Sequence, residues 1–181
     1  MQLRGVKISP LPFILKAVSH ALASVPLMNA SLGADGESVV YKKYFHIGVA
    51  VDTPDGLLVP VIRNVDTKGI WDIAAEVSEL ADKAKNRKLT PAEMQGGCFT
   101  VSSLGNIGGQ GFTPIVNTPE AGILGVSRAT VKPIYIDGEF QPRTMLPLTL
   151  SYDHRLVNGG DGGRFLNAVI ENLVELRRLI L

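Results

Sequence analysis

The sequence is short of cysteine, of net charge and of long apolar runs. Cys98 is the one cysteine among 181 residues, which excludes an internal disulfide and a cysteine-based metal cluster and favours a reducing compartment. The 18 lysines and arginines nearly balance the 17 aspartates and glutamates, so the net charge of +1 provides no basic patch for nucleic acid or an anionic membrane. No stretch reaches the roughly 18 apolar residues of a membrane-spanning helix. We therefore expect no nucleic-acid partner and no membrane partner.

The apolar content of the chain is high for its size. Hydrophobic residues make up 45% of the sequence, and the mean hydropathy is +0.19 although no long apolar helix is present. We therefore expect another subunit to cover part of the apolar surface. The sequence has no internal repeat, low-complexity tract or linker, and its length fits a single domain over residues 1–181.

Three stretches have the periodicity of helices. Apolar residues recur at helical spacing over residues 11–25, ahead of Pro26, and again over residues 70–84. In the second stretch acidic residues come first and basic residues last, which suits the helix dipole. A closing helix is predicted from about Asp161, and this residue is interpreted as the N-cap that follows the glycine-rich loop.

Strand-like runs separate these helices. They cover residues 38–44, 45–52, 57–62, 98–102, 123–126, 131–136 and 145–152. The first three are predicted to form a meander, with the turn TPDG at residues 53–56 between the second and the third. The segment TPAE at residues 90–93 is predicted to form a capping box. Few helices and many strands predict an α+β fold, with a mixed β-sheet covered by helices.

His154 is the histidine with the most informative surroundings. It lies in the segment SYDHRLVNG, residues 151–159, where a strand runs out into a glycine-rich loop before a helix. Such a position keeps the backbone rigid and the side chain open to substrate, so His154 is a candidate catalytic residue. His20, near the end of the first predicted helix, and His46, inside a predicted strand, are interpreted as packed or surface histidines. Cys98 starts an apolar run and is interpreted as a buried structural thiol.

Ser102 and Ser103 lie at another strand end, in the segment FTVSSLGNIGGQG at residues 99–111. Its glycines do not predict a phosphate loop, because no Gly-Lys-Ser/Thr is present and the segment leads to FTPIV instead of a helix. Hydrolysis by a Ser–His pair remains an alternative, although neither serine stands in a G-x-S-x-G elbow.

Several segments together resemble the dihydrolipoamide acyltransferases, the catalytic cores of 2-oxo acid dehydrogenase complexes. They are YDHRLVNGGDGGRF at 152–165, FHIGVAVDTPDGLLVPVIR at 45–63, GCFTVSSLG at 97–105, FTPIVN at 112–117 and ILGV at 123–126. Within that family, SSLG and FTPIVN are most similar to the acetyltransferase of bacterial pyruvate dehydrogenase complexes. The resemblance covers essentially the whole chain.

The resemblance implies a fold like chloramphenicol acetyltransferase and a homotrimer whose active sites lie between subunits. The implied activity is transfer of an acetyl group between dihydrolipoamide and coenzyme A, both as substrates and without a metal. His154 would deprotonate the attacking thiol, and Ser102 of a neighbouring subunit would hydrogen-bond the tetrahedral oxyanion. Asn158 stands where the family usually has an aspartate, and it is the third candidate site residue.

The resemblance also implies a larger assembly. Trimers would join into a cage through the C-terminal segment LRRLIL at 176–181, and the cage would form the core of a pyruvate dehydrogenase complex. The implied partners are lipoyl domains and the pyruvate dehydrogenase and dihydrolipoamide dehydrogenase components. The lipoyl group would be carried on domains that are absent from this chain. The N-terminal part of the family's catalytic domain would be absent as well.

The expected location is the cytoplasm in a bacterium and the mitochondrial matrix in a eukaryote. Two alternatives remain: a self-assembling core without activity, and a transferase of succinyl or branched-chain acyl groups.

Overall fold

A mixed six-stranded sheet forms the centre of the molecule in this computed structural model, which describes residues 2–3, 6–7, 9–105 and 109–179. The strand order is β12-β9-β8-β5-β6, with β7 beside β5. Neighbouring strands run parallel from β5 to β8 and from β8 to β9, and β12 is antiparallel to β9. The strands are β5 (Ile47–Thr53), β6 (Gly56–Leu58), β7 (Val61–Ile62), β8 (Phe99–Ser103), β9 (Gly122–Val126) and β12 (Leu148–Tyr152). The predicted α+β class with a mixed sheet is confirmed.

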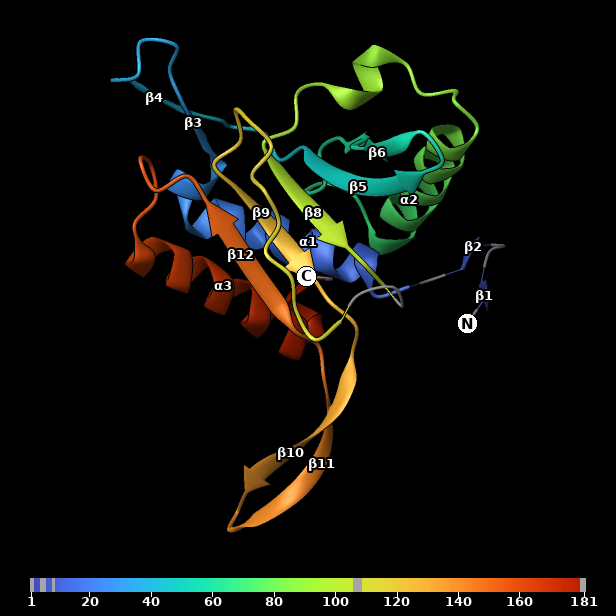
Figure 1. Cartoon of the computed structure of the whole chain (residues 1–181), viewed down its shortest axis with the longest axis vertical. Coiled ribbons are helices and arrows are strands. Elements are labelled where there is room, and N and C mark those ends of the chain that lie inside the picture. The colour runs from blue at the N-terminus through green and yellow to red at the C-terminus, as the bar shows by residue number, and fades with distance from the viewer. Residues whose placement is uncertain (1, 4–5, 8, 106–108, 180–181) are drawn as a thin grey trace.

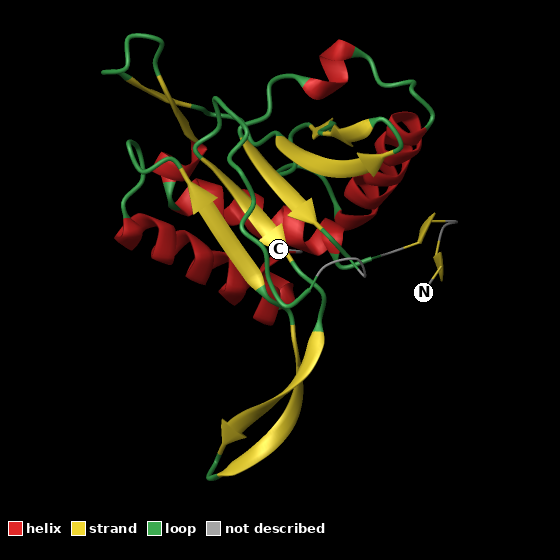
Figure 2. Cartoon of the chain, viewed as in Figure 1, coloured by secondary structure: helices red, strands yellow, loops and turns green. Residues whose placement is uncertain are grey.

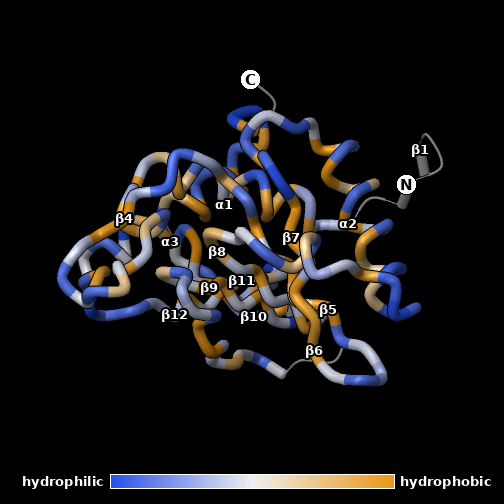
Figure 3. The backbone as a smooth tube through the Cα atoms, turned by 90° about the horizontal axis from the view of Figure 1, so that it is seen from above, coloured by the Kyte–Doolittle hydropathy of each residue, from blue (hydrophilic) through white to orange (hydrophobic). Residues whose placement is uncertain are grey.

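Three helices pack beside this sheet. They are α1 (Leu11–Ser24), α2 (Ile70–Lys85) and α3 (Gly159–Val174), and α1 and α3 lie behind the strands in the view of Figures 1 and 2. The core fills the space between helices and sheet, where the rings of Phe99 and Phe165 lie 5.1 Å apart and link β8 to α3. Figure 3 shows apolar stretches of the tube running through the interior. All three helices follow the predicted apolar periodicity. No helix in the described ranges is long and apolar enough to cross a membrane.

The other face of the sheet carries small and polar side chains. Gly122 faces the helical layer, where Met28 lies against it, whereas Gly125 faces the opposite side and meets Phe112 and Pro114. Successive strand residues point to opposite faces. Thr100 and Ser102 therefore share the helix-free side of β8 with the loop that crosses it.

A two-stranded arm extends away from the body of the protein (Figure 1). It consists of β10 (Thr130–Ile136) and β11 (Glu139–Met145), paired only with each other in the described structure. Its turn places Asp137 and Gly138 at positive φ, 51° and 90°. The sequence predicted β10, but the polar run of β11 gave no alternation and was missed.

The predicted meander is wrong in part. The segment 38–44 contains only β4 (Val39–Tyr41), and it pairs with β3 (Ala30–Leu32) in a separate ribbon instead of joining β5. The amide of Asn29 donates to the carbonyls of Lys42 and Tyr44, which holds the chain beyond β4 away from the sheet. The segment 57–62 is broken into β6 and β7 at Pro60, which has no N–H for a ladder hydrogen bond.

The remaining elements are short. They are β1 (Gln2–Leu3), β2 (Val6–Lys7) and the 3₁₀ turns η1 (Pro26–Asn29), η2 (Pro91–Met94) and η3 (Leu176–Leu179). The capping box predicted at Thr90 and Glu93 is confirmed in η2. Leu179 is buried in the core of its own chain, and residues 180–181 of the predicted joining segment lie outside the described residues.

Candidate active site

His154 lies on a turn between β12 and α3 whose backbone is fixed on both sides. The N–H of Asp153 donates to the carbonyl of Ala121 at 2.8 Å, which extends the pairing of β12 with β9 by one step. The carbonyl of Asp153 accepts from the N–H groups of Leu156 and Val157, each at 3.0 Å. His154 itself is exposed, and its ring lies 5.7 Å from that of Tyr152. The turn therefore presents an imidazole on a rigid support.

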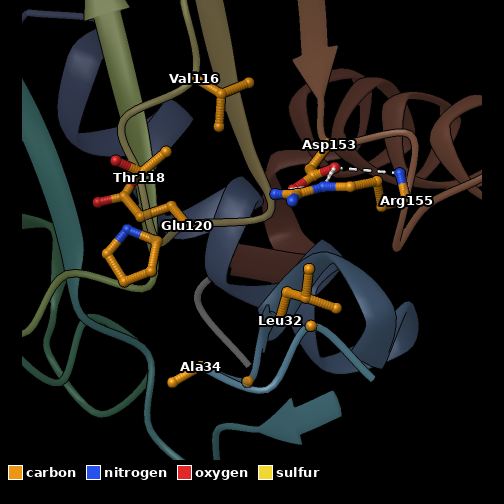
Figure 4. A pocket seen from close by; sticks show the side chains of 10 residues that line it. Leu32, Ala34, Val116, Thr118, Glu120, Asp153 and Arg155 are labelled. Atoms are coloured by element: carbon orange, nitrogen blue, oxygen red, sulfur yellow. Dashed lines mark hydrogen bonds and ion pairs between the residues drawn. The ribbon is translucent and has the colours of Figure 1, made fainter. Parts of the chain in front are cut away.

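An ion pair within the turn reinforces it. Arg155 donates from its backbone N–H to Oδ1 of Asp153 at 3.0 Å and from Nη2 to Oδ2 at 2.6 Å, as Figure 4 shows. The guanidinium of Arg155 holds the pKa of Asp153 below its ordinary value, and the backbone bond adds to this effect. Asp153 therefore stays ionised at neutral pH and keeps the turn closed.

Asn158 is the N-cap of α3. Its Oδ1 accepts from the backbone N–H of Asp161 at 2.9 Å, and the helix begins at the next residue, Gly159. The prediction that Asp161 caps this helix is wrong, because Gly159 and Gly160 already have helical backbone. Asp161 pairs instead with Arg164 at 2.5 Å. Within the described chain, Asn158 has no hydrogen bond to His154.

Ser102 is the penultimate residue of β8 and is half-buried, whereas Ser103 is exposed at the strand end. In the sheet register Ser102 aligns with Gly125 of β9, which aligns with Thr149 of β12. β12 continues from Thr149 to Tyr152, about 10 Å further at about 3.3 Å per residue. His154 lies beyond that point, so Ser102 and His154 are at opposite ends of the sheet. A Ser102–His154 nucleophile pair within one chain is excluded.

Two of the other residues make contacts within the fold that suit a structural role. His46 accepts from the N–H of Asn64 at its Nδ1, 3.1 Å away. Cys98 is fully buried and donates from Sγ to the carbonyl of His46 at 2.9 Å. Burial raises the pKa of the Cys98 thiol to about 11. His20 lies in α1, beside a separate cavity of about 680 Å³.

A cavity of about 410 Å³ lies against the turn that carries His154 (Figure 4). Its walls come from three parts of the chain: the segment from Leu32 to Gly36, the loop from Val116 to Glu120, and the side chains of Asp153 and Arg155. Glu120 was not singled out from the sequence. The one available signal was an acidic residue directly before the apolar run AGILGV. Within the described ranges, no three His, Cys, Asp or Glu side chains gather as metal ligands.

Comparison with known families gives a match over the whole chain. The profile of the 2-oxoacid dehydrogenases acyltransferase (catalytic domain) matches residues 1–181. The dihydrolipoyllysine-residue acetyltransferase component of pyruvate dehydrogenase complex is 58% identical in Pseudomonas aeruginosa and 55% identical in Azotobacter vinelandii, each over 177 residues. These matches cover 98% of this chain but 32% and 28% of the two relatives, so the chain spans about a third of their length.

Solved structures agree. One match is the Azotobacter vinelandii dihydrolipoamide acetyltransferase, whose structure was studied for the role of a serine, a histidine and an asparagine in its catalytic mechanism. It gives a TM-score of 0.95 at 54% identity, and the match covers 98% of this chain and 73% of that one. The cubic core of the pyruvate dehydrogenase multienzyme complex gives 0.95 at 55% identity with the same coverage. Chloramphenicol acetyltransferase matches with a TM-score of 0.59 at 15% identity, over 91% of this chain and 78% of that one. This match confirms the predicted fold alone. The chain therefore belongs to the 2-oxoacid dehydrogenase acyltransferase family.

Proposed function

We propose that this chain is the catalytic unit, over residues 1–181, of an enzyme that transfers an acetyl group between dihydrolipoamide and coenzyme A. The observation that carries the proposal is the exposed His154 on a fixed turn, in a chain similar over 98% of its length to acetyltransferase components. Ser102, His154 and Asn158 also reproduce the residue types and the spacing of the serine, histidine and asparagine studied in the Azotobacter enzyme.

The chemistry follows from what an imidazole can do. A thiol is a weak nucleophile until it loses its proton, so His154 accepts the proton of the incoming thiol. The thiolate attacks the thioester carbonyl and forms a tetrahedral oxyanion, to which the hydroxyl of Ser102 donates a hydrogen bond. Collapse of this intermediate releases the second thiolate, and His154 returns the proton to it. The two thiols are those of dihydrolipoamide and coenzyme A, and no step requires a metal.

The placement of Ser102 supports a site formed between subunits. Because Ser102 and His154 lie at opposite ends of one sheet, both groups meet at one carbonyl only when two chains supply them. The exposed arm supports the same conclusion, since an isolated two-stranded ribbon is marginal in water. Tyr135 and Phe140 pair across it with ring centroids 5.3 Å apart, and both are exposed. We infer that this face packs on another copy within a homotrimer.

We further infer that trimers join into a cage at the core of a pyruvate dehydrogenase complex. The match to a cubic core structure supports this assembly. The partners we propose are lipoyl domains, which carry the lipoyl group, and the pyruvate dehydrogenase and dihydrolipoamide dehydrogenase components. The proposed location is the cytoplasm of a bacterium, since the relatives named above are bacterial.

An acetyl-transfer assay with acetyl coenzyme A and dihydrolipoamide tests the proposal. We expect turnover by the wild-type protein, none by His154→Ala, and an unchanged melting temperature because His154 is exposed. His20→Gln, on α1, is the matched control and should retain turnover. A folded, assembled wild-type protein without transfer would support the structural-core alternative. Faster turnover with succinyl or branched-chain thioesters would support the other acyl alternatives. Labelling of Ser102 by a fluorophosphonate would point to hydrolysis.

A further inference from the structure

Glu120 is a buried acid in the loop that leads into β9. Its side chain is 5% exposed, although no arginine or lysine pairs with it among the described residues. The hydroxyl of Thr100, two residues before Ser102 in β8, donates to Oε2 of Glu120 at 2.6 Å. The amide of Asn117 donates to Oε1 at 3.4 Å. Glu120 therefore joins its own loop to the strand that carries Ser102.

Two glycines make room for this carboxyl group. A Cβ at Gly97 would lie 2.8 Å from Oε1 of Glu120, closer than real Cβ contacts allow. A Cβ at Gly48 would lie 2.9 Å from Oγ1 of Thr100. Neither glycine has the positive φ that would require glycine for backbone reasons. The backbone of β5 and of the segment before β8 thus leaves room for the pair formed by Glu120 and Thr100.

Burying the carboxyl group of Glu120 costs free energy of folding. Burial raises the pKa of Glu120, while Thr100 and Asn117 act in the opposite direction. The other titratable groups that face it are Lys42, whose Nζ is buried without a hydrogen-bond partner in the described chain, and Cys98. Burying an acid that lacks a direct ion pair opposes folding, and an apolar residue would pack here at lower cost. The acid therefore calls for a role beyond packing.

The backbone connects Glu120 to the turn of His154. The N–H of Glu120 donates to the carbonyl of Asn117 at 2.9 Å and closes the loop. The next carbonyl, that of Ala121, accepts the N–H of Asp153 at 2.8 Å. Any displacement of Glu120 moves this carbonyl and, with it, the residue directly before His154. Resting on the function proposed above, we propose that Glu120 is a positioning residue, which fixes the His154 turn relative to the sheet through Thr100, Asn117 and Ala121.

The test compares Glu120→Ala with Glu120→Gln in the assembled protein. Glu120→Ala removes both acceptors, and we expect kcat per folded active site to fall by about tenfold or more while KM changes less than about threefold. Glu120→Gln keeps an acceptor for Thr100 and the side-chain length, so it should recover kcat to within about threefold of wild type. Hydrogen exchange at the Asp153 amide should accelerate in Glu120→Ala and return to the wild-type rate in Glu120→Gln.

Two further variants keep the test decisive. Ile73→Val removes a methyl group from a buried residue of α2 and should lower the melting temperature without changing kcat. Gly97→Ala crowds the carboxyl group without removing it, and it should lower kcat even if Glu120→Ala fails to fold. An inactive wild-type protein would defeat the proposed function. An active wild type with unchanged kcat in Glu120→Ala or Gly97→Ala, or equal losses in the Ala and Gln variants, would overturn the positioning role.

Discussion

The ring of Tyr152 rests directly on Gly162: a Cβ at that glycine would lie 2.8 Å from Cε1 of the tyrosine. Tyr152 is the last residue of β12, and Gly162 is buried in the first turn of α3. This contact joins the two elements that flank the His154 turn. The turn is therefore held between a strand end and a helix start, and its geometry depends on a glycine that carries no chemistry.

We expect Gly162→Ala to displace the Tyr152 ring, and so to lower both the melting temperature and the rate of acetyl transfer. Gly163→Ala is the matched control, because nothing lies within 4 Å of a Cβ at that exposed position. There, alanine should stabilise the protein by up to about 1 kcal/mol through helix propensity alone. Thermal unfolding and transfer rates of both variants check the prediction, which fails if the two variants behave alike.

A mixing experiment tests the site between subunits. His154→Ala and Ser102→Ala are each expected to be inactive or severely impaired, the latter by about 10²–10³-fold in kcat. When equal amounts are unfolded and reassembled together, about a quarter of the interfaces in a symmetric trimer should combine an intact His154 with an intact Ser102. Recovery of about that fraction of wild-type turnover is the expected result. No recovery in properly assembled mixed trimers would mean that both residues act within one chain.

Asn158 is expected to act through the start of α3. Asn158→Ala removes the cap on the Asp161 N–H and should reduce the free energy of unfolding by about 1 kcal/mol. Asn158→Asp keeps an acceptor, so its free energy of unfolding should stay within a few tenths of a kcal/mol of the wild-type value. Its kcat should change less than about tenfold. Chemical denaturation and a pH–rate profile measure both effects. A large acceleration by Asn158→Asp would show that a negative charge beside His154 matters more than the cap.

Cys98 is expected to be inert in the folded protein. Its thiol is fully buried, and its pKa of about 11 leaves almost no thiolate at pH 8. A disulfide reagent should therefore titrate no thiol until denaturant unfolds the chain, and one thiol afterwards. Cys98→Ala serves as the blank. Rapid labelling in the native state would show that the chain opens locally at the start of β8.

The buried acid predicts a specific dependence of stability on pH. Because burial raises the pKa of Glu120 above its ordinary value of 4.5, the folded state holds this proton more tightly than the unfolded chain. Stability contributed by the protonated form is lost as pH rises from about 4.5 through the raised pKa. Glu120→Gln cannot titrate, so its stability advantage over wild type should grow across that window and level off above it. Urea unfolding at fixed protein concentration measures this difference, and a constant difference would contradict the prediction.

The helices were predictable from sequence because their apolar residues recur with one period, and α1 is also flanked by prolines. α2 matches the predicted stretch, with early acidic and late basic residues in place. The strands β8, β9 and β12 were also found, since β9 is a short apolar run and the other two alternate apolar with polar residues over most of their length. The candidate residue His154 was identified for the same local reason: a strand that ends in a turn is visible in the sequence.

What the sequence could not provide is pairing between distant segments. β4 has strand-like residues, but its partner β3 is fixed by the hydrogen bonds of Asn29, which no local pattern indicates. Glu120 is a single acid in a loop, and its burial depends on Thr100 and on glycines from two other segments. The separation of Ser102 from His154 is likewise a matter of sheet register. Local periodicity carries no information about these relations.

The free-standing arm would be in different surroundings in a lone copy and in the proposed trimer. Its tip, at Asp137 and Gly138, stands clear of the body and joins two strands that have no third strand beside them in the described structure. In a lone copy this ribbon frays easily, and a frayed ribbon is what a protease cuts. Packing against another copy would cover it. The arm that would pack between subunits is therefore also the segment that we expect limited proteolysis to cut first in an unassembled chain.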